Sequence, residues 1–295
     1  MRVALYGRAL PDGHKSGLLA CVAAFAQAGV EVVLYNRLAE ALQRLGENWT
    51  GPVFGDSLPE MGKNGFFVTL GGDGTLLDSV VHVRERGIPV LGINYGRLGY
   101  LTSALPEQMF GVVQQLIDGQ FSIEQRRMVR MESEEHLFGD CPCALNELAI
   151  HKSNLTSVIR IQVQVNGDYM NTYHADGLVI STPTGSTGYN LSCGGPIAMP
   201  EAAVFVVSAV APHNLNVRPV VLPDTVVLHL NISSAGSGVM LSMDSRSAFT
   251  PKPGRITVYR NPFDFPLVRL NGQSHLSTLR SKLMWGVDRR NERDL

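Results

Sequence analysis

The sequence predicts an α/β domain with a parallel sheet, followed by a mostly β domain. Two observations carry this prediction. In the first part, short apolar runs alternate with helical stretches, the order typical of βαβ units. In the second part, apolar and polar residues alternate along strands that Ser-, Gly- and Pro-rich turns separate. A length of 295 residues fits two domains, since a typical domain has ~150 residues.

The first part contains two rounds of strand and helix. In the first round the Ala- and Leu-rich helical stretch ends at Gly29, and in the second a glycine cluster separates strand from helix. The expected elements are, in order, a strand at Val3–Tyr6, a helix at Gly17–Ala28, a strand at Val30–Tyr35, a strand at Phe66–Leu70, a helix at Leu76–Arg86 and a strand at Ile88–Ile93.

The second part is expected to be antiparallel. Ile159–Val165 alternates apolar and polar residues, and the Asn166-Gly167-Asp168 that follows is a hairpin turn signal. Further strands are expected at Val226–Ile232, Val239–Met243 and Arg255–Tyr259. Leu276–Trp285 has helical apolar spacing and is expected to dock on the first domain. The expected domains are therefore residues 1–122 completed by a C-terminal helix within 273–295, and residues 123–272.

Composition excludes several classes of protein. Twenty-five Lys and Arg against 26 Asp and Glu give a net charge of −1, and 44% of the residues are hydrophobic, so neither disorder nor a nucleic-acid-binding surface is expected. The apolar stretch Ala202–Ala211 is interrupted by Ser208 and is shorter than the ~20 residues of a membrane-spanning helix. The N-terminal apolar run is too short for a secretory signal. We expect a cytoplasmic protein without a membrane span.

The four cysteines match neither a structural zinc pattern nor a C-x-x-C redox pair. Cys141 and Cys143 flank Pro142, but no second pair of Cys or His at suitable spacing accompanies them. All four are interpreted as packing thiols, and no protein-held metal is predicted.

The glycine cluster Gly71-Gly72-Asp73-Gly74-Thr75 lies between a predicted strand and a predicted helix. Glycines allow close approach to a ligand, and a helix N-terminus attracts anions, so this loop is suited to phosphate oxygens. Asp73 repels phosphate unless it binds a metal or accepts a proton, which favours a chemical role. The alternative is a tight turn with Asp73 or Thr75 as N-cap. Neither the G-x-G-x-x-G nor the P-loop signature is present.

Two further segments are suited to a nucleotide. Asp176–Ser192 opens from a buried strand into small and hydroxylated residues and one aromatic, which offers short donors and acceptors to a flat polar ligand. Asn146 and Glu147 can share the two hydroxyls of a ribose. Taken alone, the first is also explained as a Ser- and Thr-rich surface loop, and the second as a solvated turn.

Taken together, these segments resemble the NAD kinase family in order and spacing. The resemblance runs from about Phe66 to the end. G-G-D-G-T alone is shared with the wider diacylglycerol-kinase and phosphofructokinase group, and its combination with P-T-G-S-T-G-Y makes the resemblance specific. The segments that carry it are Gly71–Thr75, Asn94–Leu101, Asn146-Glu147, Asp176–Ser192, Ala211–Pro219 and Leu279–Gly286.

The resemblance implies a role for each matching residue. Asp73 corresponds to the catalytic aspartate, with Gly74 and Thr75 as phosphate-contacting neighbours. Tyr100 corresponds to an aromatic residue beside the adenine of NAD, and Asn146 and Glu147 to the pair that holds a ribose. The remaining matches are Asp176 near the far end of the dinucleotide, His174 at a position often basic in relatives, the adenine-side loop Thr187, Gly188, Tyr189, Asn190, Leu191 and Ser192, and Asp244 with Arg246 near the ligand.

Two of these matches carry an alternative. His174 is also explained as a strand histidine that faces solvent, and Gly188 stands where many relatives have Ala, which leaves room for local flexibility. Arg246 belongs to the segment Asp244-Ser245-Arg246, which aligns with a D-G-x or D-S-x site.

The implied reaction is transfer of the γ-phosphoryl group of ATP, with a divalent ion, Mg²⁺, to the adenosine ribose 2′-hydroxyl of NAD. The resemblance places NAD between the two domains and implies a homo-oligomer, a homotetramer or a homodimer, with the tetramer favoured. The alternatives are a related lipid or sugar-phosphate kinase and a non-catalytic dinucleotide-binding regulator. The sequence leaves open NAD against NADH, ATP against polyphosphate, the number of subunits, and regulation by NADP or NADPH.

Overall fold

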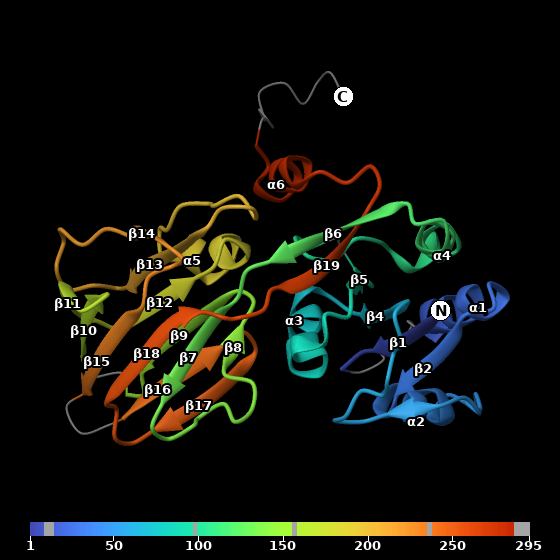
Figure 1. Ribbon diagram of the computed structural model, residues 1–295, viewed down its shortest axis with the longest axis horizontal. Coiled ribbons are helices and arrows are strands. Elements are labelled where there is room, and N and C mark those ends of the chain that lie inside the picture. Colours follow the sequence, from blue (N-terminus) through green and yellow to red (C-terminus); the bar gives the residue numbers. More distant parts are fainter. Residues whose placement is uncertain (9–14, 97–98, 155–157, 235–237, 286–295) are drawn as a thin grey trace. The chain divides into compact units, whose positions relative to one another are not determined.

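The computed structural model describes residues 1–8, 15–96, 99–154, 158–234 and 238–285. The chain forms two compact units. Unit 1 comprises Met1–His82, Ile88–Glu124 and Pro266–Leu295, and unit 2 comprises Val83–Gly87 and Gln125–Phe265. Figure 1 gives the labels of the elements.

Unit 1 contains a seven-stranded sheet in the order β3-β2-β1-β4-β5-β19-β6. Its strands are β1 (Arg2–Tyr6), β2 (Glu31–Tyr35), β3 (Val53–Phe54), β4 (Gly65–Leu70), β5 (Val90–Ile93), β6 (Phe121–Arg126) and β19 (Phe265–Leu270). Its helices are α1 (Lys15–Gln27), α2 (Asn36–Arg44), α3 (Asp73–Val83), α4 (Met109–Ile117) and α6 (His275–Leu283), with the short 3₁₀ turn η2 (Pro106–Gln108). A second 3₁₀ turn, η1 (Arg84–Arg86), follows α3 and belongs to unit 2.

The predicted parallel sheet is confirmed. β1 pairs in parallel with β2 and β4, and β4 pairs in parallel with β5. Every residue of β4 is buried, as expected for a parallel strand covered on both faces. The sequence analysis assigned residues 123–272 to the second domain, a range that includes β19. In the structure β19 pairs in parallel with β5 and belongs to the sheet of unit 1.

Unit 2 contains two six-stranded sheets, in the orders β11-β10-β15-β18-β7-β8 and β14-β13-β12-β9-β16-β17. The strands of the first are β7 (Val129–Ser133), β8 (Cys143–Ala144), β10 (Ile159–Val165), β11 (Asp168–Ala175), β15 (Leu228–Ser234) and β18 (Arg255–Arg260). The second has β9 (Glu147–Lys152), β12 (Gly177–Ser181), β13 (Val204–Val210), β14 (Val220–Pro223), β16 (Val239–Met243) and β17 (Arg246–Thr250), with η3 (Thr184–Thr187) and α5 (Tyr189–Ser192) after β12.

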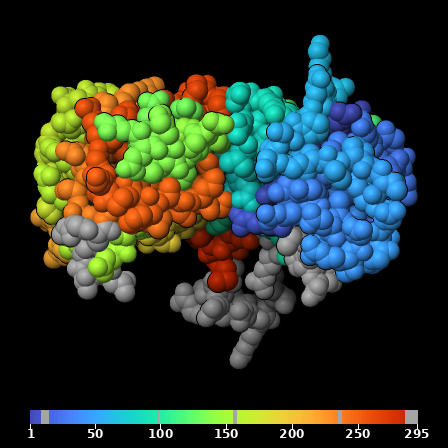
Figure 2. Space-filling model, turned by 90° about the horizontal axis from the view of Figure 1, so that it is seen from below, coloured from blue at the N-terminus to red at the C-terminus, as the bar shows by residue number. Residues whose placement is uncertain are grey.

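The mostly β character of the second part is also confirmed. Ile159, Ile161 and Val163 are fully buried on β10, and the hairpin β10–β11 turns at the predicted Asn166-Gly167. Their side chains join one apolar cluster with residues of both sheets, including Leu148, Leu178 and Leu241. In Figure 2 the green segment that follows β7 lies against the orange region of β17 and β18, in agreement with the pairing of β7 and β18.

Three local differences from the sequence predictions matter. α3 begins at Asp73 rather than Leu76, so part of the glycine cluster forms the first helical turn. α2 and α4 are helices that the sequence analysis did not predict. In α6, Leu279 is 2% exposed and Leu276 is 56% exposed, so only part of the predicted apolar face is buried. Residues 286–295 of the predicted C-terminal segment lie outside the described residues. Among the residues that the structure describes, no helix is long and apolar enough to cross a membrane.

Candidate active site

Asp73 holds a loop of unit 1 through its carboxylate. It is separated from β4 by Gly71 and Gly72 and lies in the first turn of α3, where the helix dipole favours a negative charge. Its Oδ2 accepts a hydrogen bond from the backbone N–H of Tyr100 at 2.7 Å. Its Oδ1 accepts from the N–H groups of Leu101 and Thr102, both at 3.2 Å. The predicted catalytic residue therefore fixes the segment that contains the predicted adenine-side Tyr100.

Two glycines make this close approach possible. Gly71 has φ of +154°, and a Cβ there would lie 2.3 Å from the Oγ1 of Thr75. A Cβ at Gly99 would lie 1.8 Å from Oδ1 of Asp73. Any side chain at Gly99 would displace the carboxylate. The hydrogen bonds between Asp73 and the loop therefore require glycine at position 99.

Polar groups fix the same loop from its other side. Thr102 Oγ1 accepts from the N–H of Gly99 at 2.7 Å and from Nδ2 of Asn94 at 3.2 Å. Asn94 Oδ1 accepts from the N–H of Gly96 at 2.9 Å. Residues 97 and 98, part of the Asn94–Leu101 motif, lie outside the described residues.

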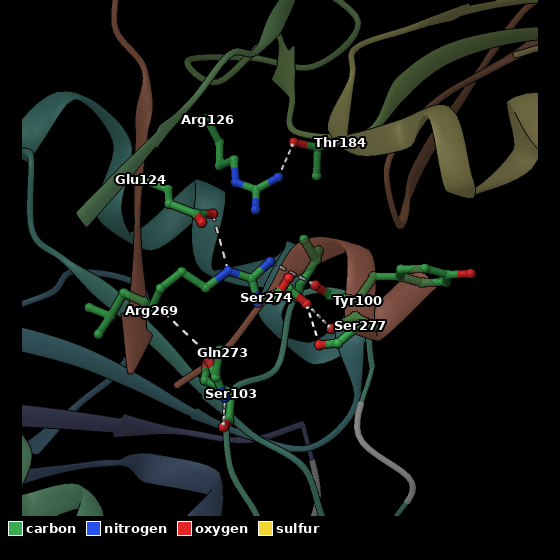
Figure 3. A network of polar contacts seen from close by, with 12 residues as sticks. Tyr100, Ser103, Glu124, Arg126, Thr184, Arg269, Gln273, Ser274 and Ser277 are labelled. Carbon is green, nitrogen blue, oxygen red and sulfur yellow. Dashed lines mark hydrogen bonds and ion pairs between the residues drawn. The ribbon is translucent and has the colours of Figure 1, made fainter. Parts of the chain in front are cut away.

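Arg269 on β19 adds a buried cation behind Tyr100. It is 8% exposed, and its Nε lies 3.1 Å from Oε2 of Glu124. Its Nη2 donates to the carbonyl oxygen of Tyr100 at 3.2 Å, and Figure 3 shows the guanidinium group between these two partners, with the Tyr100 ring pointing away from it. Gln273 donates to the carbonyl of Ser103. Arg269 thus braces the loop that Asp73 holds.

Arg8 lies beside the glycine cluster. Asp78 on α3 pairs with its guanidinium group, and Nη2 of Arg8 also donates to the carbonyl of Gly74 at 3.1 Å. Gly72 and Gly74 are exposed and Thr75 is half-buried, and the first N–H groups of a helix have no partner within it. The region therefore offers backbone donors and one guanidinium group to an anion.

In unit 2, the turn between β8 and β9 is held by Asp244. Its carboxylate accepts from the N–H groups of Leu145 at 2.8 Å and Asn146 at 2.7 Å. Its own N–H donates to the carbonyl of Glu147 at 3.3 Å. Thr182 holds the turn from the second side, because its N–H donates to the carbonyl of Asn146 and its hydroxyl to that of Leu145. The backbone of Asn146 and Glu147 is therefore fixed.

The side chains of this pair keep unused polar atoms. Asn146 Oδ1 and Glu147 Oε2 are buried, and neither has a hydrogen-bond partner among the described residues. Such atoms are costly in a folded protein and mark places where a ligand or water binds. Burial, with a smaller contribution from the charge of Asp244, raises the pKa of Glu147 to about 8. Burial likewise raises the pKa of Asp244 to about 6, against its backbone hydrogen bonds.

The loop after β12 comes next to the same pair. The backbone N–H of Tyr189 donates to the Glu147 carboxyl group, and a Cβ at Gly188 would lie 3.4 Å from Oε2 of Glu147. The ring of Tyr189 packs on that of His151, with centroids 5.4 Å apart. Asp176 pairs with Lys152 at 2.6 Å. Unit 2 therefore brings Asn146, Glu147, Gly188 and Tyr189 together.

Other predicted residues have different surroundings. Asn190 is fully buried, and its amide bonds the carbonyls of Ser186 and Pro196 and the hydroxyl of Ser208. Arg246 donates to the carbonyls of Cys141 and Cys143. His174 is exposed on β11, which agrees with the alternative interpretation of a strand histidine facing solvent. Thr187 and Leu191 are half-buried, and Ser192 is exposed.

Sequence reasoning missed several residues of these surroundings. His151 had a signal, since residues two apart on a strand share a face and Glu147, Ala149 and His151 therefore line one side of β9. Arg269 and Arg126 had none. Arg126 is 1% exposed and its Nη1 points to Thr184 Oγ1 at 3.5 Å, as Figure 3 shows. Their partners are far away in the sequence.

Comparison with known proteins identifies the family. A model of the ATP-NAD kinase N-terminal domain matches residues 60–121, and one of the C-terminal domain matches residues 145–270. An NAD kinase of Cytophaga hutchinsonii is 41% identical over 232 residues, 79% of this chain and 80% of the relative. An NAD kinase of Porphyromonas gingivalis is 41% identical over 233 residues, 79% of each chain.

Solved structures agree in fold. Yeast NADH kinase complexed with NADH superposes with a TM-score of 0.82 at 21% identity, covering 98% of this chain and 89% of that chain. An NAD kinase from Archaeoglobus fulgidus in complex with ATP superposes with a TM-score of 0.73 at 26% identity, covering 96% and 99%. With matching domain models, close relatives over most of its length and the same fold, the chain belongs to the NAD kinase family.

Proposed function

We propose that this protein transfers the γ-phosphoryl group of ATP to the 2′-hydroxyl of the adenosine ribose of NAD, giving NADP. Family membership supports the reaction. The single observation that carries it in this chain is the pair of buried oxygens on Asn146 and Glu147 that have no hydrogen-bond partner in the part of the chain that the structure describes. A ribose diol offers two hydroxyls, each of which can donate and accept.

The proposed role of Glu147 follows from its environment. With a pKa of about 8, the carboxyl group is mostly protonated near neutral pH. A neutral carboxyl group accepts a hydrogen bond from one hydroxyl and donates to another. Asn146 Oδ1 accepts a further one. Glu147 and Asn146 therefore hold the ribose in a fixed orientation, while Asp244 orients their backbone.

Asp73 is proposed as the general base of the transfer. Its Oδ2 accepts only the N–H of Tyr100 among the interactions described, and each carboxylate oxygen has two lone pairs. One lone pair thus remains for the proton of the attacking hydroxyl, a role typically worth ~10²–10⁴-fold in rate. The exposed glycines of the cluster and Arg8 are proposed to bind phosphate oxygens.

The described residues do not fit a protein-held metal. They contain no group of three or more His, Cys, Asp or Glu side chains able to hold an ion, and three backbone donors already engage the Asp73 carboxylate. We propose that Mg²⁺ enters as part of the ATP substrate. Charge neutralisation on the phosphoryl group is the main requirement of such a transfer.

The remaining site residues are proposed in narrower roles. Tyr100 and Tyr189 present aromatic rings to the dinucleotide, with Thr187, Gly188, Leu191 and Ser192 forming the loop around it. Asp176 stays paired with Lys152 near the dinucleotide. Asn190 shapes the loop from inside, since its amide is fully engaged.

Incubation of the purified protein with NAD, ATP and Mg²⁺ tests the proposal through the NADP formed. If the protein binds NAD but forms no NADP in this incubation, the result supports a dinucleotide-binding regulator instead. A protein that phosphorylates a lipid or sugar phosphate and ignores NAD supports the related kinases.

We also propose a cytoplasmic homo-oligomer, a tetramer rather than a dimer. The sheet edges of the β-rich unit and the half-exposed α6 need cover, and symmetric closure is the usual solution. Light scattering is expected to return a multiple of 32.1 kDa. A fully active sample with the mass of one chain contradicts the oligomer.

A further inference from the structure

Two cysteine thiols lie in direct contact at the edge of unit 2. Cys141 Sγ and Cys143 Sγ are 3.5 Å apart and hydrogen-bonded, on the two sides of Pro142. The residues are 6% and 1% exposed. Cys143 begins β8, which pairs with β7 at the sheet edge, and the segment before Cys141 turns at His136 and Gly139, both with positive φ. A disulfide requires ~2.05 Å between the sulfurs, so they have about 1.5 Å to close.

The positive charge of Arg246 lies next to the pair. Its guanidinium group donates to the carbonyl oxygens of both cysteines and lies over the ring of Phe138, 5.7 Å from its centroid. Arg84 lies on the same side and pairs with Asp140 at 3.7 Å. The hydrogen bond from Cys143, followed by the charges of Arg246 and Arg84, lowers the pKa of Cys141. Cys141 is thus the better nucleophile, since the thiolate is the reactive form.

A cavity lies next to the pair, at the proline between the two cysteines. A cavity of about 480 Å³ is lined by Pro142 itself and by His136, Leu137 and Gly139 of the preceding turn. Hydrogen peroxide is small enough to enter a cavity of this size and to come within one residue of each cysteine.

We propose that Cys141 and Cys143 form a dithiol that hydrogen peroxide oxidises to a disulfide, and that this oxidation loosens the turn of Asn146 and Glu147. The Cys141 thiolate attacks one peroxide oxygen, the O–O bond breaks, and the leaving hydroxide takes a proton to give water. The Cys143 sulfur then attacks the Cys141 sulfenic acid, the S–S bond forms, and the S–O bond breaks with loss of a second water. The two sulfurs lose two electrons and the peroxide gains two.

The cysteine pair is connected to the turn of Asn146 and Glu147 by a few hydrogen bonds and by a short stretch of chain. Arg246 donates hydrogen bonds to both cysteine carbonyls and is two residues from Asp244. Asp244 in turn accepts hydrogen bonds from the N–H groups of Leu145 and Asn146. Asn146 is itself three residues from Cys143. Formation of the S–S bond moves the two carbonyl oxygens that Arg246 binds. The turn of Asn146 and Glu147 is then disturbed through the chain from Cys143 and through Arg246 and Asp244.

Peptide mapping of peroxide-treated protein, with remaining thiols alkylated after quenching, tests the chemistry. The peptide with Cys141 and Cys143 is expected to lose two hydrogens and escape alkylation, and dithiothreitol is expected to reverse this. Cys141→Ser and Cys143→Ala are each expected to abolish the change, while Cys193→Ala keeps it. Arg246→Lys is expected to slow disulfide formation several-fold. Alkylation of both cysteines after treatment, or only irreversible oxidation, overturns the proposal.

Hydrogen exchange of the Leu145 and Asn146 amides tests the coupling without any substrate. Exchange is expected to be at least five-fold faster in the disulfide form, and unchanged exchange overturns this part. The consequence for NAD rests on the proposed function: binding to the oxidised protein should weaken at least five-fold and recover on reduction. A reduced protein that does not bind NAD contradicts the proposed function, and the mapping and exchange results still decide the dithiol.

Discussion

Asp73 and Glu147 are two carboxyl groups with opposite surroundings. Three backbone N–H groups converge on Asp73 and hold its carboxylate in place. Glu147 has one backbone donor, a buried oxygen without a partner among the described residues, and a raised pKa. The first arrangement fixes the position of a carboxylate; the second leaves a group that a ligand completes. Substitutions at the two positions should therefore fail in different ways.

Asp73→Asn has the largest expected effect. It removes the base, so kcat for NADP formation should fall by ~10²-fold or more while KM for NAD changes by only a few-fold. The amide of Asn also places an N–H group against the N–H donors of the loop, which disturbs the loop. Comparing kcat with KM separates loss of the base from this disturbance. Asp118→Asn, at an exposed helix end, is the matched control. A variant with raised KM and normal kcat would reduce Asp73 to a holder of the loop.

Glu147→Ala is expected to act on binding. Removing the carboxyl group leaves a ribose hydroxyl unpaired, at about 1–3 kcal/mol or roughly five- to 150-fold in Kd. Calorimetry with NAD measures this, with Glu132→Ala, at an exposed position of β7, as control. Unchanged affinity in a folded Glu147→Ala protein means that the pair is structural.

The raised pKa of Glu147 predicts a pH-dependent stability. The folded chain keeps a proton up to about pH 8, whereas the unfolded chain releases it near 4.5, so this contribution is present below about pH 4.5 and is lost as pH rises through about 8. Glu147→Gln has no proton to lose and should gain about 1–3 kcal/mol over the wild type between about pH 5 and about pH 8.5. Urea unfolding at both pH values measures the difference. A constant difference contradicts the raised pKa.

Arg269→Lys has the smallest expected effect. Lysine keeps the charge but cannot bridge Glu124 and the Tyr100 carbonyl with a planar fork. The Tyr100 loop should loosen, raising KM for NAD a few-fold with little change in kcat. Arg2→Lys, whose fork to Glu31 is on the surface, is the control. Equal kinetics for both variants would show that Tyr100 needs no support from Arg269.

Local chemistry made much of the fold predictable. The apolar runs and the alternation along β10 specify strands without any knowledge of their neighbours, because burial on one or both faces imposes its own period. α2 escaped prediction although its two buried residues, Leu38 and Leu42, are four residues apart on one helical face, because a helix of nine residues repeats that spacing only once. α3 begins earlier than predicted because Asp73 is stabilised at a helix N-terminus.

The sequence by itself determined the two fold classes, the glycine cluster, the Asn146-Glu147 pair and the family. Each depends on residues that are adjacent or regularly spaced. Only the tertiary structure decided that Asp73 binds the loop of Tyr100 and that Asp244 holds the turn of Asn146. It alone brought Arg246 onto Cys141 and Cys143, about a hundred residues away. Such contacts arise when strands pair, and pairing partners are set by the packing of whole sheets, which no local pattern encodes.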